Sequence, residues 1–378
     1  MPKDTPSRPD PARYARHLAL TEIGSAGQQR LAASSVLVVG AGGLGSPAAL
    51  YLAAAGVGTL GIIDHDRIEV SNLQRQILFA TAEVGTSKAQ AARTRLIELN
   101  PDVHVVAHDL KLAAGNVLQL LGAYDVIVDG TDRLATRYLV NDACVLLGKP
   151  LVSAAIHRFE GQAMTYVPGR SPCYRCLYPH SPADLVPNCA TAGVLGVLPG
   201  VMGSVQATEA LKLLLGIGEP LTGRLLVYDA LSLSFDEFRF TRRLDCAVCG
   251  DHPTITDIAH HEESRLSGIT EWTPEQLAQA LKQDGDERLL LVDVRELQEW
   301  AAGRLPGSLH IPLGTLPQRH QEIPHDATPV FICAAGMRSM AACRFLAAQG
   351  RSAVNLTGGI YAWSSIYGAP PPPHDHQH

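Results

Sequence analysis

The sequence predicts an α/β protein with a larger, doubly wound and mostly parallel sheet and a second, smaller α/β domain. Its 378 residues are enough for two or three domains. Hydrophobic residues make up 46% and charged residues 18%, which is a globular composition. Short apolar strands alternate with helical segments in two separate regions, and this alternation indicates parallel sheets covered by helices.

The first region of alternation begins at residue 35. SVLVVG has the pattern of a buried strand, GAGGLG is a glycine turn, SPAALYLAAAG is a helix that ends at a glycine, and TLGIID is the next strand. YDVIVDGTD contains another strand, which the helix ATRYLVNDACVLLG and the strand KPLVSAAI follow. This order predicts a Rossmann-like, doubly wound sheet.

The second region follows a segment rich in histidine and acidic residues. WTPEQLAQALKQ carries a proline at the first turn of an expected helix, RLLLVDVRE and PVFIC are expected strands, and RSMAACRFLAAQG is an expected helix. We therefore divide the chain into a flexible arm (1–12), a first domain (13–250), a linker (251–269), a second domain (270–367) and a disordered tail (368–378).

Charge and hydropathy exclude several classes of protein. A net charge of −6 argues against a nucleic-acid partner, because binding to phosphate backbones requires a basic face. Two long uncharged runs, 31–63 and 185–208, are interrupted by glycine and proline, so we expect no membrane span and no membrane partner. The N-terminus lacks the apolar segment of a signal peptide, which indicates a cytoplasmic protein with reduced cysteines.

The glycine turn predicts a nucleotide site. GAGGLG fits G-x-G-x-x-G between a strand and a helix, and Asp64 ends the next strand, where a carboxylate can accept from ribose hydroxyls. By themselves, these features are also typical of a dinucleotide-dependent oxidoreductase. The segments that follow add Arg75 and Lys88, and a triphosphate under attack requires such cations. Taken alone, the same segment could also be a solvated polar loop.

The cysteines form two C-x-x-C pairs in the first domain. Cys173, Cys176, Cys246 and Cys249 have the number and spacing of a tetrahedral Zn²⁺ site with no open position, which predicts a structural zinc ion. Two redox pairs or disulfides are the alternatives.

Another cysteine, Cys333, ends a strand and opens the loop CAAGMRS before a helix. A helix N-terminus and the charge of Arg338 stabilise a thiolate at such a position and make it reactive, while Gly336 permits a tight loop. Cys144 and Cys343 lie in apolar helical patterns and are expected in the core.

A resemblance to a known family covers roughly residues 12–250. RYARH, GAGGLG, DHDRIEVSNLQRQ, GTSKA, DGTD, PLVSAAIHRFEGQ, PCYRC and CAVCG occur in the order found in molybdopterin-synthase adenylyltransferases of the MoeB and ThiF types, which are related to ubiquitin-activating enzymes. This resemblance implies that the protein adenylates the C-terminal glycine of a ubiquitin-fold sulfur-carrier protein, using ATP and Mg²⁺.

The resemblance also implies roles for individual residues. The implied ATP contacts are Gly43, Asp64, Ser71, Asn72, Leu73, Gln74, Arg75, Lys88, Asp132 and Arg133. Asp132 would help to organise Mg²⁺, and Arg133 stands where the family usually has asparagine. Arg16 resembles an arginine supplied to the neighbouring subunit, which implies a homodimer. Cys189 matches a loop cysteine that some members link covalently to the carrier; a buried or unused thiol is the alternative.

The second domain resembles rhodanese-type sulfurtransferases over about residues 270–367, through CAAGMRS, LLLVDVRE, GRLPGSLHIPL and LTGGIYAW. The resemblance implies that Cys333 carries a persulfide, loaded by a donor such as a cysteine desulfurase. The short loop before Ser339 is the length used for sulfur and not the longer loop of related phosphatases. An inactive module used for docking is the alternative.

Together, the two domains predict adenylation of a carrier followed by sulfur transfer to give a thiocarboxylate. A dinucleotide-dependent oxidoreductase and a non-catalytic scaffold for ubiquitin-fold proteins are the competing hypotheses. The sequence does not name the carrier, because the small subunit of molybdopterin synthase and the carriers of thiamine, tRNA-thiolation and cysteine pathways share a Gly-Gly tail.

Overall fold

The computed structural model describes residues 10–179, 193–259, 269–282, 288–347 and 349–370. The chain forms two compact units with a boundary between His260 and His261. Each unit has its own sheet, and each is described separately below.

The first unit contains a sheet of eight strands in the order β3-β2-β1-β4-β5-β6-β7-β8. The strands are β1 Ser35–Val39, β2 Thr59–Ile63, β3 His104–His108, β4 Val126–Asp129, β5 Leu151–His157, β6 Glu160–Tyr166, β7 Arg224–Asp229 and β8 Ser234–Arg239. The helices are α1 Ala15–Leu18, α2 Gly24–Ala33, α3 Gly45–Ala54, α4 Lys88–Leu99, α5 Ala114–Gly122, α6 Leu134–Leu147, α7 Tyr174–Leu177 and α9 Leu198–Leu215.

The predicted doubly wound, mostly parallel sheet is confirmed. Strands β3, β2, β1, β4 and β5 pair in parallel. The remaining strands, β6, β7 and β8, extend this sheet by antiparallel pairing, which the sequence analysis did not anticipate.

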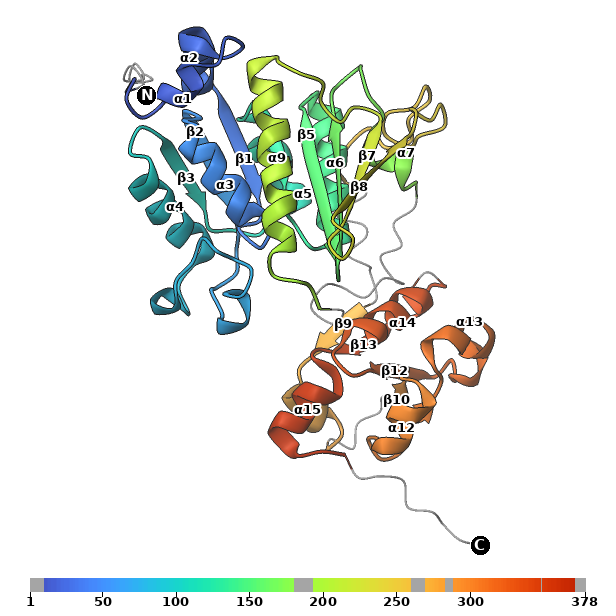
Figure 1. Cartoon of the computed structure of the whole chain (residues 1–378). Coiled ribbons are helices and arrows are strands. Elements are labelled where there is room, and N and C mark those ends of the chain that lie inside the picture. Colours follow the sequence, from blue (N-terminus) through green and yellow to red (C-terminus); the bar gives the residue numbers. More distant parts are fainter. Residues whose placement is uncertain (1–9, 180–192, 260–268, 283–287, 348, 371–378) are drawn as a thin grey trace, which may run out of the picture. The chain divides into compact units, whose positions relative to one another are not determined.

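Two hydrophobic cores cover the two faces of this sheet. Side chains alternate along a strand, so Val36 and Val38 of β1 face one core, while Leu37 and Val39 face the other. The first core is completed by α3, α4 and α9, and the second by α5 and α6 (Figure 1). Helices on both faces explain why the parallel strands read as continuous apolar runs.

The order of the strands reverses between β1 and β4. From β1 the chain continues to β2 and β3 on one side, and later to β4 and β5 on the other. The turns that follow β1 and β4 therefore leave the same edge of the sheet in opposite directions. Open α/β sheets bind ligands at such a switch point, so this edge is the first place to look for a site.

The second unit contains a five-stranded sheet in the order β11-β10-β12-β13-β9, with every neighbouring pair parallel. Its strands are β9 Ile269–Trp272, β10 Arg288–Asp293, β11 Leu309–His310, β12 Ala327–Ile332 and β13 Ala353–Leu356. Its helices are α11 Pro274–Ala280, α12 Leu297–Ala302, α13 Leu316–Arg319, α14 Met337–Ala347 and α15 Gly359–Tyr367.

The start of the second unit differs in detail from the predicted helix WTPEQLAQALKQ. Trp272 ends strand β9, and the helix begins two residues later, at Pro274. Thr273 caps it by accepting a hydrogen bond from the backbone N–H of Gln276, so the chain changes from strand to helix at this residue.

Within the described residues, no helix has both the length and the apolar character needed to cross a membrane.

Candidate functional site

The glycine turn between β1 and α3 depends on close backbone approach. Gly40 has a φ of +91°, a value that L side chains rarely adopt. A methyl group at Gly45 would overlap the carbonyl oxygen of Gly40, whereas one at Gly42 would meet only the amide nitrogen of Gln76, at 3.8 Å. The turn therefore places the N-terminus of α3 directly at the end of β1, where its backbone N–H groups favour an anion.

Asp64 is bonded to this turn. One carboxylate oxygen accepts the backbone N–H of Ala41 at 2.8 Å, and the other accepts that of Asp66 at 2.9 Å. Burial raises the pKa of Asp64, although the backbone N–H of Asp66 and the charge of Lys88 oppose this shift. The end of β2 is thus tied to the end of β1.

Lys88 lies at the start of α4 and is only 5% exposed. Its ammonium group donates to a carboxylate oxygen of Asp66 at 3.2 Å. Burial would raise the pKa of Asp66, but the charge and hydrogen bond of Lys88, with the charges of His65 and Arg133, together outweigh burial, and the pKa is lowered overall. Two carboxylates in succession therefore connect Lys88 to the glycine turn.

Arg75 lies against the turn itself. Its Cγ is 3.5 Å from the place that a Gly43 methyl group would occupy, and Pro199 of α9 lies 3.2 Å from the same place. The guanidinium group donates to the carbonyl oxygen of Ser71 at 3.1 Å. Arg75 thus reaches the switch point from the segment that follows β2.

The remaining residues of this segment have different surroundings. Asn72 is buried and accepts the backbone N–H of Glu69 at 3.2 Å, while the Ser71 hydroxyl donates to the Glu69 carboxylate. Leu73 packs against the first core, and the backbone of Gln74 contacts that of Gly196. These contacts shape the segment that carries Arg75.

Gln76 was not among the predicted site residues. Its side chain is 4% exposed and lies beside Gly42, and its carbonyl oxygen has no hydrogen-bond partner in the described part of the chain. Buried polar atoms are nearly always paired. The position of Gln76 beside Gly42 follows from the fold and could not be found from the sequence.

The turn after β4 completes the edge. Gly130 lies against the glycine turn, with its would-be methyl group 3.0 Å from the Gly45 nitrogen. Asp129 is fully buried and accepts from the Thr131 backbone and hydroxyl and from the Ser153 hydroxyl. Asp132, by contrast, is exposed just before α6.

Arg133 follows Asp132 and is also exposed. The charge of Arg133 helps to lower the pKa of Asp66. Its influence is smaller than that of burial, which raises this pKa, and smaller than that of Lys88, which lowers it. The ends of β1, β2 and β4 and the start of α4 are therefore close in space, and the predicted nucleotide residues lie at these ends and in the segment between β2 and α4.

Arg16 lies elsewhere. It is exposed on α1, and the neighbouring Tyr14 packs against Gly56, just beyond the C-terminal end of α3. The ten-residue helix α3 is about 15 Å long, so its length separates Arg16 from the glycine turn. Within one chain, Arg16 is not part of the same cluster.

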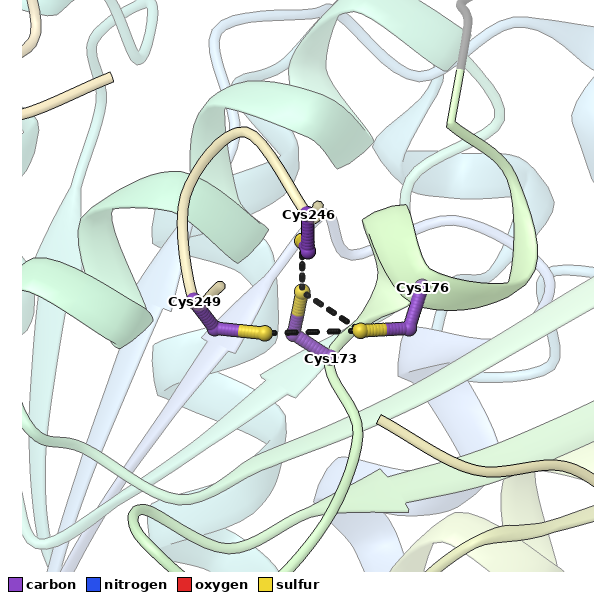
Figure 2. A group of neighbouring side chains, drawn as sticks. All are labelled: Cys173, Cys176, Cys246 and Cys249. Carbon is purple, nitrogen blue, oxygen red and sulfur yellow. Dashed lines mark hydrogen bonds between the residues drawn. The ribbon is translucent and has the colours of Figure 1, made fainter. Parts of the chain in front are cut away.

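The four predicted zinc ligands lie together (Figure 2). Their sulfur atoms are 4.0 Å apart for Cys173 and Cys176, 3.6 Å for Cys173 and Cys246, and 3.4 Å for Cys176 and Cys249. Tetrahedral zinc with bonds of about 2.3 Å needs sulfurs about 3.8 Å apart. The cluster thus has the chemistry and the size of a closed zinc site.

The surroundings of the cluster suit thiolate ligands. Cys176 accepts the backbone N–H of Arg243 at 3.4 Å, and hydrogen bonds among the four sulfurs lower the pKa of Cys176 and Cys246 while those of Cys173 and Cys249 are raised. Gly250 closes the second pair, since any side chain there would contact the carbonyl oxygen of Cys246. Four such thiolates require a cation to offset their charge.

A buried ion pair joins the cluster to α6. Arg175, on α7 between the first two cysteines, donates two bonds of 2.7 and 2.6 Å to Asp142, which is fully buried. The backbone N–H of Tyr174 donates to Asn141 at 2.8 Å. Ile258, in the segment that the sequence analysis assigned to a linker, is buried in the same core.

Three further cysteines were considered in the sequence. Cys189 lies outside the described residues. Cys144 and Cys343 are fully buried; burial raises the pKa of Cys144 well above its ordinary value and that of Cys343 to about 12. Both therefore remain neutral thiols in the cores.

In the second unit, Cys333 lies between β12 and α14 and is 1% exposed. Its sulfur accepts the backbone N–H of Gly336 at 3.1 Å and the hydroxyl of Ser339 at 3.3 Å. Gly336 has a φ of +91°, which lets the loop curl around the sulfur. Two donors thus converge on one sulfur. Ser339 was named in the sequence only as the end of the loop.

The start of α15 supports this loop from behind. Ile360 and Tyr361 donate their backbone N–H groups to the carbonyl oxygens of Cys333 and Ala334 at 2.8 and 3.0 Å. A side chain at Gly359 would overlap the Cys333 carbonyl. The glycines of LTGGIYAW thus allow two segments to meet.

Arg338, the cation of the loop, is held by Glu299 of α12. Its two terminal nitrogens donate to the two carboxylate oxygens at 2.7 and 2.6 Å. Hydrogen bonding to Arg338 lowers the pKa of Glu299, so the carboxylate is ionised at neutral pH. Sequence reasoning did not identify Glu299, because nothing in the sequence pairs residues 39 positions apart.

Chemically, the first unit offers a helix N-terminus, two cations and an exposed carboxylate at one sheet edge, which suits a polyphosphate under attack. The second unit offers a sulfur held by two donors at the end of a strand.

Comparison with known proteins supports these two assignments. Residues 14–248 match the model of the ThiF family, and residues 273–366 match that of the rhodanese-like domain.

Relatives share both regions. The chain is 44% identical over 380 residues to the "probable adenylyltransferase/sulfurtransferase MoeZ" of Mycobacterium tuberculosis, covering 96% of this chain and 95% of that protein. It is 43% identical to the mouse "adenylyltransferase and sulfurtransferase MOCS3", covering 96% and 87%. The "sulfur carrier protein adenylyltransferase" of Thermus thermophilus is 53% identical over 256 residues, covering 66% and 94%.

Solved structures share the fold of the first unit. The microcin C7 biosynthetic enzyme MccB in complex with N-formylated MccA superposes with a TM-score of 0.57 at 24% identity, covering 65% of this chain and 77% of MccB.

Proposed function

Because the chain belongs to the ThiF family and carries a rhodanese-like domain, as do relatives named adenylyltransferase/sulfurtransferase, we propose that it acts on a ubiquitin-fold sulfur-carrier protein. It adenylates the C-terminal glycine of the carrier and then converts this glycine to a thiocarboxylate. No relative described above is named an oxidoreductase, and two of them are named for both enzymatic activities, so neither the oxidoreductase nor the scaffold hypothesis is supported.

In the first step, a carboxylate oxygen of the carrier attacks the α-phosphorus of ATP. A new P–O bond forms, the bond to the β-phosphate breaks, and pyrophosphate leaves with the electron pair. Both reactants are anions, so the step requires charge offset and alignment more than proton transfer. The observation that carries this proposal is the position of Arg75 and Lys88 beside the glycine turn.

We assign the roles accordingly. Arg75 and Lys88 bind phosphate groups, and Asp64 holds the ribose through lone pairs that the backbone N–H groups leave unused. Exposed Asp132 holds Mg²⁺, which offsets phosphate charge. The other proposed nucleotide contacts are Gly43, Ser71, Asn72, Leu73, Gln74 and Arg133, and to these the structure adds Gln76.

Zn²⁺ is the proposed occupant of the four-cysteine cluster. Because all four positions of a tetrahedral ion are filled, it stabilises the fold and takes no part in the reaction. It clamps α7 to the segment that follows β8, and through Arg175 and Asp142 it fixes α6.

In the second step, Cys333 carries a persulfide. Its terminal sulfur attacks the carbonyl carbon of the acyl adenylate, a C–S bond forms, and AMP leaves. The product is an acyl disulfide. A thiol reductant then attacks the Cys333 sulfur, releases the carrier thiocarboxylate and remains as a mixed disulfide. We assign the thiol to an external reductant, and Cys189 keeps the role that the resemblance implies for it, a covalent link to the carrier.

The proposed partners follow from this chemistry. They are a carrier with a Gly-Gly tail, a persulfide donor such as a cysteine desulfurase, and a second copy of this chain that supplies Arg16. We place these reactions in the cytoplasm, where the described cysteines, all free thiols, stay reduced.

Pyrophosphate exchange tests the first step. The protein is incubated with ATP, labelled pyrophosphate and each candidate carrier, and we expect exchange that depends on the carrier's terminal glycine. Cys333→Ala should leave this exchange intact while it abolishes sulfur transfer from thiosulfate. Absence of exchange with every Gly-Gly carrier, or unchanged sulfur transfer in Cys333→Ala, would falsify the corresponding step.

A further inference from the structure

An ion pair between Arg338 of the Cys333 loop and Glu299 bears on which sulfur donors can bind. Arg338 is the only cation in CAAGMRS, and Glu299 occupies both of its terminal nitrogens. The two side chains are 33% and 35% exposed, so the pair is open to solvent and to a ligand approaching the loop. A bidentate pair of this kind has fixed geometry and no net charge.

Other cations near the loop are also occupied. Arg295 acts on Glu299 from a distance, but its guanidinium is bonded to Asp293 and to the Gly303 carbonyl. The donors to the Cys333 sulfur are a backbone N–H and a hydroxyl, which are neutral. Among the described residues of this centre, Arg338 is therefore the positive charge that Glu299 cancels.

We propose that Glu299 determines which sulfur donors Cys333 accepts, by neutralising Arg338 and so weakening the binding of small anionic donors. This inference rests on the sulfur transfer proposed above. A donor such as thiosulfate carries two negative charges and depends on a free cation for capture. A persulfide on a protein does not, since other contacts position it. The Glu299–Arg338 pair thus favours a protein-borne persulfide over an inorganic anion.

Thiosulfate provides the probe. The Cys333 thiolate attacks its outer sulfur, a new S–S bond forms, the S–S bond of thiosulfate breaks, and sulfite leaves with the electron pair. Cyanide then takes the outer sulfur as thiocyanate and regenerates the thiolate. The full chain is assayed with thiosulfate, a dianion, and with benzenethiosulfonate, a monoanion, at several ionic strengths.

In Glu299→Gln we expect the KM for thiosulfate to fall about three- to tenfold, with a smaller fall for benzenethiosulfonate, because the attraction grows with donor charge. This KM should rise steeply with salt in the variant and stay nearly constant in the unchanged protein. Glu299→Gln/Arg338→Gln should return it to the starting value or higher. Glu322→Gln is the matched control, because Glu322 forms the same bidentate pair with Arg319 elsewhere in this unit.

The salt dependence of the unchanged protein keeps the test valid if Glu299→Gln folds poorly. A steep salt dependence there would overturn the inference, because the Arg338 charge would then not be cancelled. An unchanged or higher KM in folded Glu299→Gln would also overturn it, since Glu299 would then only position Arg338. Loss of transfer from both donors in the unchanged protein would instead refute the proposed function of Cys333.

Discussion

The two cations at the glycine turn differ in how they are held. Arg75 is half-buried and bonded to a backbone carbonyl, whereas Lys88 is almost fully buried with one carboxylate partner, Asp66. A buried ammonium group with a single partner has donors to spare. Of the two cations, Lys88 is therefore better suited to donate hydrogen bonds to the leaving phosphate as negative charge develops on it.

Replacement of Lys88 tests this role. In Lys88→Met we expect the rate of pyrophosphate exchange to fall about 10²- to 10³-fold, as when one preorganised electrostatic contact is lost. Arg95→Met is the control, because Arg95 lies on the same helix and pairs only loosely with Glu98, at 3.9 Å. Equal losses in both variants would show that charge on α4 matters only for the fold.

Individual residues also show what the sequence could not resolve. The segment VDGTD carries two aspartates, Asp129 and Asp132, and the role assigned to Asp132 came from the family resemblance. The structure shows how the two aspartates differ. Asp129 is buried and accepts three hydrogen bonds from protein groups, while Asp132 is exposed. Gln76 and Glu299 depend on contacts across the fold, which spacing along the chain does not reveal.

At the scale of elements, two glycines of the glycine turn meet different requirements: Gly45 is needed for close backbone packing, and Gly42 for the approach of phosphate. In Gly45→Ala the new methyl group overlaps the Gly40 carbonyl, whereas in Gly42→Ala it has space. We expect Gly45→Ala to lower the melting temperature by several degrees, and Gly42→Ala to retain it while raising the KM for ATP, because phosphate approaches the backbone there. Thermal melts and ATP kinetics of both variants measure this. Equal melting temperatures would contradict the steric argument.

The cysteine cluster acts on the site through α6. This helix begins directly after Asp132 and is bonded to α7 through Asp142 and Arg175. We therefore expect about one zinc ion per chain, and in Cys246→Ser a loss of zinc, a lower melting temperature of the first unit and weaker adenylation.

Elemental analysis and thermal melts make this measurement. Cys343→Ala, in the other unit, is the control and should keep its zinc. A Cys246→Ser protein that retained both metal and stability would rule out a structural zinc site.

Predictability differed among the elements. The buried parallel strands and their helices could be predicted from the sequence, because an apolar run followed by glycine or by helical periodicity is compatible with few other structures. Strands β6 to β8 were missed: β6 and β7 are inner strands with antiparallel neighbours, and β8, SFDEFR, is an edge strand that is largely exposed and has no core-facing pattern. Strand β9 was missed because ITEW is short and is defined by its pairing with β13.

For the molecule as a whole, the proposed role of Arg16 implies a second copy of the chain. It is separated from its own glycine turn by α3, so its proposed role is in a partner's site. An equal mixture of Arg16→Met and Lys88→Met chains, unfolded and refolded together, should recover about a quarter of the activity of the unchanged protein, since half of the dimers contain one intact site of two.

Pyrophosphate exchange before and after mixing measures this recovery. The same mixture without subunit exchange is the control. If the co-refolded mixture stays as inactive as its components, each site is built from a single chain.

The central claim is that this protein catalyses both steps that convert the C-terminal carboxylate of a carrier protein to a thiocarboxylate. Mass spectrometry of a Gly-Gly carrier, after incubation with ATP, a persulfide donor and a thiol reductant, tests it most directly. We expect the unchanged protein to replace one terminal oxygen of the carrier by sulfur, and Cys333→Ala to stop at the adenylate. A thiocarboxylate formed equally well by Cys333→Ala would contradict the account.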